Sequence, residues 1–108
     1  MTTSRRSKLE AMLSADPSDS FLRYALALEM RKEGLADESI RELHSLTMDS
    51  PPYIPSFLMA AQQLVDESRI SEAREYLRRG IDEARNQGDL HAAGEMSELL
   101  SHLGQLGD

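Results

Sequence analysis

Two consecutive 34-residue stretches decide the fold of this chain. They are Ser20–Tyr53, SFLRYALALEMRKEGLADESIRELHSLTMDSPPY, and Ile54–Gln87, IPSFLMAAQQLVDESRISEAREYLRRGIDEARNQ. A shift by the length of one stretch, called one repeat length below, places Leu43 on Leu77, and the apolar residues of both stretches recur with the period of a helix. A repeat of this length indicates a helix–turn–helix unit that is copied and stacked, because one unit alone cannot bury its apolar face.

The composition of the 108-residue chain restricts its chemistry. It contains no cysteine, which excludes disulfides, zinc–thiolate sites and thiol catalysis. The formal net charge of -7 repels a phosphate backbone, so we expect no nucleic-acid partner, and the small basic group Arg5, Arg6 and Lys8 is read as a solvated helix start. No apolar run follows these arginines as in a signal peptide, and none could span a bilayer. We therefore expect no membrane partner and a cytoplasmic location.

Helical periodicity runs through nearly the whole sequence, and a mix rich in Ala, Leu, Met, Glu and Arg favours helix over strand. Gly34 and Pro51 mark helix ends. We expect Ser71 to cap the fifth helix and Gly80 to mark a close contact between two helices. The expected helices span about 4–15, 20–33, 37–48, 54–68, 72–86 and 90–103.

The repeat resembles the tetratricopeptide repeat (TPR) family, whose 34-residue pattern is W-x2-L-G-x2-Y, then A-x3-F, then P. The match is by size class rather than by identity. The second unit reads Phe57-x2-Ala60-Ala61-x2-Leu64, then Ala73-x3-Leu77. The first unit reads Arg23-x2-Leu26-Ala27-x2-Met30, then Ser39-x3-Leu43, then Pro51.

Two departures from the family pattern have structural consequences. Arg23 stands where the family has a large aromatic residue, so we expect Phe21, Leu22 or Tyr24 to fill the gap. Arg85 stands where the closing proline would be, so we expect the fifth helix to continue by about a turn.

The same register extends to both ends of the chain. Leu9 lies one repeat length before Leu43, so residues 4–17 resemble the second helix of a preceding unit, and residues 88–103 resemble the first helix of a following one. In this closing helix the positions that would face a further helix are polar or tiny: His91, Gly94, Glu95 and Glu98. The opposite stripe would pack onto the stack: Leu90, Ala93, Ser97 and Leu100, with Met96 and Leu103 beside them.

The sequence therefore predicts one all-α domain over residues 1–108, a six-helix, right-handed α-solenoid of stacked antiparallel helix pairs. Its parts are a lone helix (4–17), repeat 1 (20–53), repeat 2 (54–87), a closing helix (88–103) and a frayed tail (104–108). A polar outer face is typical of a terminal cap, so we expect the chain to be near-complete.

We find no catalytic or cofactor-binding signal in the sequence. General acid–base or nucleophilic catalysis needs paired groups, and no serine or cysteine nucleophile accompanies His44. Four side chains on one face of the closing helix have residue types that bind zinc: His91, Glu95, Glu98 and His102. We interpret them as the polar cap face, because four residues on one straight helix span too great a length for one ion. We expect no enzyme, no metal and no cofactor.

The resemblance implies a concave face, lined by the first helix of each unit, that binds a segment of another protein. In the TPR register the expected partner groove comprises Phe21, Tyr24, Leu28, Arg31, Lys32, Leu58, Gln62, Val65, Asp66, Met96 and Leu99. An apolar surface of this kind typically marks a contact site. In so short a stack, however, Phe21, Leu28 and Leu58 could simply pack together. Arg31 and Lys32 are its only cations, which argues against the clamp that some TPR domains use for acidic chaperone tails.

Two functions follow from this interpretation. The first is a non-enzymatic protein–protein interaction module that binds a peptide or helix of an unidentified partner in the groove. The alternative is a homodimer that buries the groove, or the edge formed by Leu99, Leu103 and Leu106.

Overall fold

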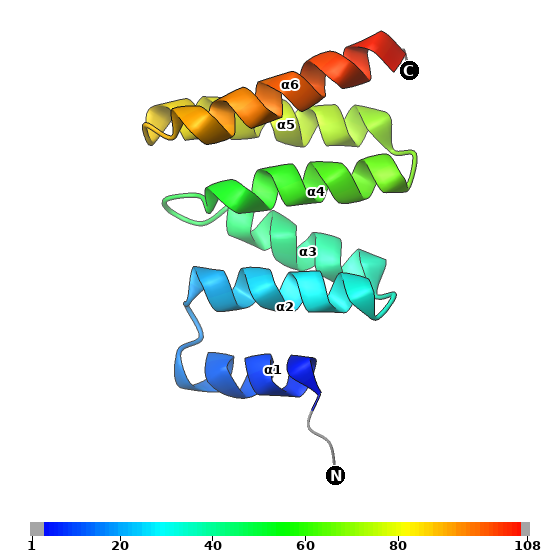
Figure 1. Ribbon diagram of the computed structural model, residues 1–108. Coiled ribbons are helices and arrows are strands. Elements are labelled where there is room, and N and C mark those ends of the chain that lie inside the picture. Colours follow the sequence, from blue (N-terminus) through cyan, green and yellow to red (C-terminus); the bar gives the residue numbers. More distant parts are fainter. Residues whose placement is uncertain (1–3, 107–108) are drawn as a thin grey trace.

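The computed structural model describes residues 4–106 and shows a stack of helices with no strand in that part of the chain (Figure 1). The stack is elongated, with principal extents of 49 × 29 × 18 Å. The predicted all-α solenoid is confirmed. The helices are α1 (Arg5–Ala15), α2 (Ser20–Lys32), α3 (Ala36–Thr47), α4 (Ile54–Asp66), α5 (Ile70–Asn86) and α6 (Leu90–Leu106).

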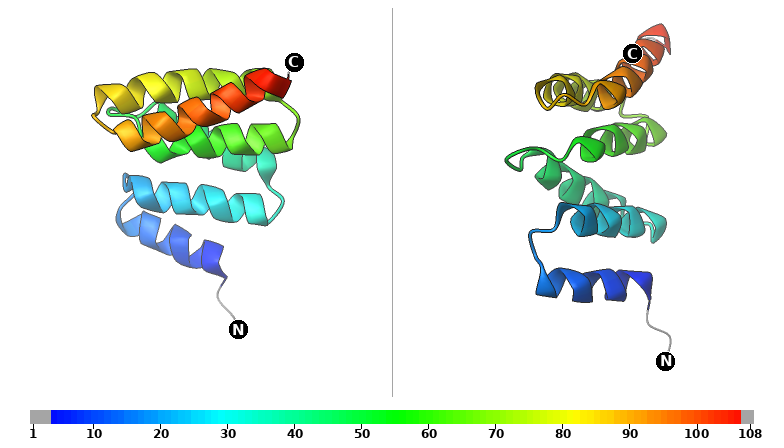
Figure 2. Two further views of the ribbon diagram at one scale, coloured as in Figure 1. Left: turned by 45° about the horizontal axis from the view of Figure 1, so that its top comes forward. Right: turned by 60° about the vertical axis from the view of Figure 1, so that its left-hand side comes forward.

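The period of the sequence reappears in the helix boundaries. α2 and α4 begin at Ser20 and Ile54, one repeat length apart, and they have equal lengths. α3 and α5 begin at Ala36 and Ile70, which are separated by the same interval. Each helix packs mainly on its neighbours in the chain, as the alternate views in Figure 2 show.

Local signals set most of the helix ends. The Asp19 carboxylate accepts a hydrogen bond from the Leu22 amide at 3.0 Å and caps α2, and Gly34, with φ of +83°, supplies the left-handed residue after that helix. The expected cap at Ser71 is wrong. α5 begins two residues earlier than expected, at Ile70, and the turn before it is closed by the Arg69 amide, which donates to a backbone carbonyl of α4.

The core runs through the middle of the stack, and its largest fully buried side chains include Phe57, Leu43 and Leu77. Gly80 lies on α5 where that helix approaches both α4 and α6. A Cβ added there would lie 2.5 Å from the Met96 sulfur and 2.6 Å from the Phe57 Cβ. The predicted close helix contact at Gly80 is therefore confirmed.

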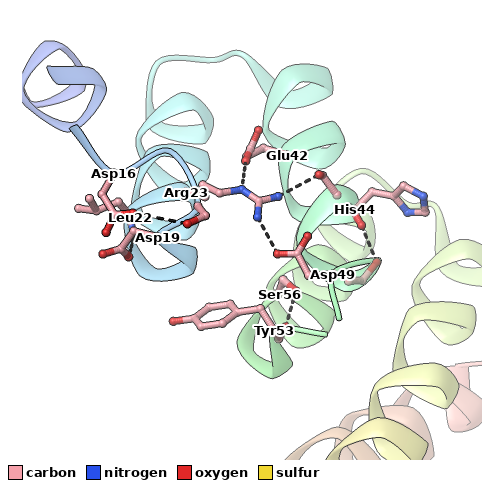
Figure 3. A network of polar contacts seen from close by, with 12 residues as sticks. Asp16, Asp19, Leu22, Arg23, Glu42, His44, Asp49, Tyr53 and Ser56 are labelled. Carbon is pink, nitrogen blue, oxygen red and sulfur yellow. Dashed lines mark hydrogen bonds and ion pairs between the residues drawn. The ribbon is translucent and has the colours of Figure 1, made fainter. Parts of the chain in front are cut away.

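The position of the family's large aromatic residue is occupied in the first unit by Arg23 itself (Figure 3). The Arg23 guanidinium donates to the Glu42 carboxylate at 3.1 Å, the Ser45 hydroxyl at 2.9 Å and the Asp49 carboxylate at 2.6 Å. Its side chain is only 16% exposed, whereas Phe21 is 64% exposed. Phe21 therefore does not fill this gap, and three acceptors on α3 and the following loop hold the arginine there.

The last helix departs from the repeat register. α5 has 17 residues where α3 has 12, since it continues through Arg85, the position equivalent to Pro51. α6 consequently begins at Leu90, two positions later than one repeat length after the start of α4. Leu90, which the register places inward, is 72% exposed, whereas Ala93 and Met96 are 5% and 1% exposed. The buried stripe of α6 therefore begins at Ala93, and the placement of Leu90 in that stripe is wrong.

The outer face of α6 is polar, as expected, and His91, Gly94, Glu95 and Glu98 are all exposed. The helix continues to Leu106, so residues 104–106 of the expected frayed tail are helical, and residues 107–108 lie outside the described part. The last turns are tied to α5, because Leu103 is fully buried and its carbonyl accepts a hydrogen bond from the Arg74 guanidinium at 3.2 Å.

Candidate partner groove

One side of the stack is formed by α2, α4 and α6, with α3 and α5 behind them (Figure 1). α4 packs extensively on α5 but meets α6 at few points. A depression of about 240 Å³ lies along the seam between α4 and α6. Its lining residues come from α2, α4, α6 and the turn before α6: Tyr24, Ile54, Pro55, Leu58, Met59, Gln62, Asp89, His91, Ala92, Glu95 and Met96.

A second hollow, wider and more open at about 650 Å³, continues from the first along the same seam. Leu58, Gln62 and Glu95 line both hollows, so the two are continuous. We call them together the α4–α6 groove. The residues of the second hollow are Leu58, Gln62, Glu95, Glu98, Leu99, Ser101 and His102.

Five of the predicted groove residues meet in the α4–α6 groove: Tyr24, Leu58, Gln62, Met96 and Leu99. Met96 differs from the other four because its side chain is only 1% exposed and packs against Gly80. It supports the floor from below and is not available as a contact residue. The reason is that Met96 belongs to the buried stripe of α6, together with Ala93 and Leu103.

Three further predicted residues lie beside the groove, and two of them, Arg31 and Asp66, join α2 to α4. The Arg31 guanidinium forms an ion pair with the Asp66 carboxylate and also contacts the Met59 sulfur at 3.5 Å. Val65 is partly buried against the core of the second repeat. The two charges therefore join neighbouring repeats, and a ligand would meet them as a pair.

Phe21, Leu28 and Lys32 are the remaining predicted residues, and all three lie on α2. None of the three lines the α4–α6 groove. Phe21 and Lys32 are exposed, and Leu28 is half-buried. The alternative in which Phe21, Leu28 and Leu58 pack together does not describe this arrangement, because Leu58 packs instead against the α4–α6 core.

The acidic rim of the groove was not among the predicted site residues. Asp89, Glu95 and Glu98 line its α6 side, and the Asp89 carboxylate also caps α6 by accepting from the Ala92 amide at 3.1 Å. The repeat register pointed Glu95 and Glu98 at a following helix instead. The signal that could have located them is Arg85, since the longer α5 makes α6 begin two positions later than the repeat register.

Burial affects the one tyrosine in the groove. The Tyr24 ring lies 5.6 Å from the Tyr53 ring, and burial, followed by the neighbouring Tyr53, raises the pKa of Tyr24 above its ordinary value. Tyr24 therefore presents a neutral hydroxyl at the α2 side of the groove at physiological pH.

The four side chains with metal-binding residue types do not form a metal site. The His91 Nε2 and a Glu95 carboxylate oxygen lie 3.3 Å apart, one helical turn from each other. No three His, Asp or Glu side chains within residues 4–106 converge as a metal-binding group. The groove can offer apolar contact, hydrogen bonds and negative charge, all of which suit the recognition of another chain.

Comparison with known proteins supports this architecture. The solution NMR structure of a tetratricopeptide repeat domain protein from Salinibacter ruber is 26% identical, with a TM-score of 0.79 over 84% of this chain and 92% of that chain. The solution structure of a protein from Bordetella parapertussis is 21% identical, with a TM-score of 0.78 over 96% of this chain and 90% of that chain, which shows the fold alone. No family profile and no curated protein matches the sequence.

The fold and these neighbours define a class, the all-α solenoids built from helix pairs. Within that class the chain is a TPR-like solenoid, similar to the tetratricopeptide repeat domain of the Salinibacter protein. No helix within residues 4–106 combines the length and apolar character needed to span a membrane.

Proposed function

We propose that this chain is a non-enzymatic interaction module that holds an extended or helical segment of a partner protein in the α4–α6 groove. The observation that carries the proposal is the depression of about 240 Å³, where Leu58, Met59 and Ala92 offer apolar surface beside a polar rim. A small apolar hollow with a polar surround suits one anchoring side chain of a partner. The TPR-like fold supports such a scaffold role, and we place the protein in the cytoplasm.

The rim favours a particular ligand charge. Asp89, Glu95 and Glu98 line the α6 side, while the one arginine nearby, Arg31, is already paired with Asp66. The net charge of -7 acts in the same direction. A partner segment with an apolar anchor and basic flanking residues therefore matches the groove best, since complementary charge speeds encounter and excludes acidic segments.

Selection from a random peptide library displayed on phage tests the proposal. Peptides enriched on the wild-type protein should lose at least about tenfold in affinity for Leu58→Glu, which places a charge in the apolar floor. Arg78→Glu serves as the matched control, because Arg78 is exposed on α5 and lines neither hollow. Equal binding to wild type and Leu58→Glu, with both variants folded by circular dichroism, would show that the groove is the wrong surface.

Self-association through the last helix has less support than binding of a foreign segment. Leu103 is fully buried inside the monomer, so it cannot contribute to a dimer edge with Leu99. Light scattering after size-exclusion chromatography separates the two proposals. A mass near 12.1 kDa fits the monomeric module, and twice that mass fits the dimer.

A further inference from the structure

The N-terminal end of the stack presents a helix surface that is covered everywhere else in the solenoid. α3 packs between α2 and α4, whereas the described part of the chain packs on α1 mainly through α2 (Figure 1). Met12 on α1 is 53% exposed, but Leu46, the equivalent residue one repeat length later on α3, is fully buried. The outer face of α1 therefore corresponds to a face that another helix covers on α3, but within residues 4–106 no helix covers it on α1.

The equivalence of α1 and α3 rests on contacts as well as on sequence spacing. Arg5 on α1 forms an ion pair with Glu29 on α2 at 3.3 Å. At the positions one repeat length later, the Ser39 hydroxyl donates to the Gln63 side chain at 3.1 Å, from α3 to α4. α1 therefore meets α2 in the same register in which α3 meets α4.

The outer face of α1 corresponds to a face of α3 that is covered by α2. Two arginines of α2 hold this helix in place. Arg23 pairs with Glu42 on α3, and Arg31, eight residues later, pairs with Asp66 on α4. Eight helical residues span about 12 Å along the axis. Between the two arginines α2 buries apolar and small residues, Leu26 and Ala27 among them.

At the N-terminal end of the stack, the positions equivalent to the two acidic partners, Glu42 and Asp66, are occupied by lysines. Lys8 on α1 stands one repeat length before Glu42, and Lys32 on α2 stands the same interval before Asp66. Both lysines are exposed, and neither forms an ion pair within residues 4–106. A helix seated here in the manner of α2 would need carboxylates, not arginines, at the two anchoring positions.

We propose that this end surface, formed by Lys8, Ala11, Met12 and Ala15 of α1 with Phe21 and Lys32 of α2, docks an amphipathic helix of a partner protein that carries two carboxylates eight residues apart. The helix would occupy the place of the first helix of a preceding repeat. Its carboxylates would pair with Lys8 and Lys32, and its apolar side chains would cover Met12. Phe21, at 64% exposed, would contact its edge. This surface is separate from the α4–α6 groove, because none of its residues lines that groove.

The probe is built from the chain's own α2. A peptide of residues 18–34 carrying Arg23→Glu and Arg31→Glu is compared with the unchanged peptide by fluorescence anisotropy. We expect the substituted peptide to bind the wild-type protein about tenfold more tightly, because it exchanges two like-charge contacts for two exposed ion pairs. The protein variant Lys8→Glu/Lys32→Glu should reverse the preference, and Met12→Asp should weaken both peptides at least about tenfold.

Each outcome has a defined meaning. If Lys8→Glu/Lys32→Glu leaves the peptide preference unchanged, the peptide binds elsewhere, for example on α3 in place of the protein's own α2, and the proposal is overturned. A protein that is dimeric by light scattering and becomes monomeric in Met12→Asp overturns it as well, since a second copy would then be the occupant. Leu58→Glu should not affect this peptide, which keeps the result independent of the groove. Circular dichroism confirms that each variant is folded.

Discussion

Two glycines on adjacent helices should respond to the same substitution with opposite signs. A Cβ at Gly80 would lie 2.5 Å from the Met96 sulfur and 2.6 Å from the Phe57 Cβ, and at least the second atom sits too near the backbone to move freely. Overpacking of this kind costs about 1–3 kcal/mol, while alanine regains up to about 1 kcal/mol of helix propensity. We expect Gly80→Ala to lower the free energy of unfolding by about 1–2 kcal/mol.

Gly94 on α6 is the matched control, because a Cβ there meets no atom within 4 Å. Gly94→Ala should gain only the helix propensity and raise the free energy of unfolding by about 0.5–1 kcal/mol. Thermal unfolding followed by circular dichroism should show a lower Tm for Gly80→Ala, by roughly 4–15 °C, and a higher Tm for Gly94→Ala. A Gly80→Ala protein as stable as wild type would refute the close packing of α5 against α4 and α6.

Two other perturbations follow from the polar contacts. Arg23→Met should lower the free energy of unfolding by about 1–3 kcal/mol in urea titrations, because it leaves Glu42 and Asp49 without their charged donor. Arg23→Lys should recover only part of this lost stability, because lysine lacks the planar fork of donors. A urea midpoint of Arg23→Met equal to that of wild type would contradict the stabilising role of these contacts. Burial raises the pKa of all three tyrosines in the folded chain. As the pH rises above about 10, the unfolded chain therefore loses its phenolic protons before the folded chain does. The contribution of these tyrosines to the free energy of unfolding is complete below about pH 10 and falls as the pH rises further. Phenolate absorbance should therefore rise at higher pH in the native protein than in urea, and coincident curves would contradict this burial.

Sequence alone predicted most of the fold because its signals are local and periodic. The 34-residue spacing recurs in the helix starts at Ser20 and Ile54, and Gly34 gave the end of α2. Arg85 in place of the closing proline also indicated that α5 continues to Asn86, and α6 begins at Leu90 as expected. The exposure of Leu90 was not predicted, because it depends on packing between helices.

The candidate site was predicted less completely than the fold. The sequence placed Met96 both beside the inward stripe of the closing helix and in the groove, and the structure buries it, whereas Glu95 lies at the rim. Arg23 also differed from expectation, because its acceptors lie on α3 and the loop after it, and a search for a replacement apolar residue overlooks them. Both differences arise from contacts between elements, which periodicity does not encode.

Backbone amide chemical shifts test most directly whether a partner segment binds in the α4–α6 groove. The protein is labelled with ¹⁵N and titrated with the tightest peptide from the phage selection. We predict the largest shift changes at Leu58, Gln62, Ala92 and Glu95, with the outer face of α5 around Arg78 unaffected. Shift changes concentrated on α3 or α5, with the four groove amides unmoved, would contradict it.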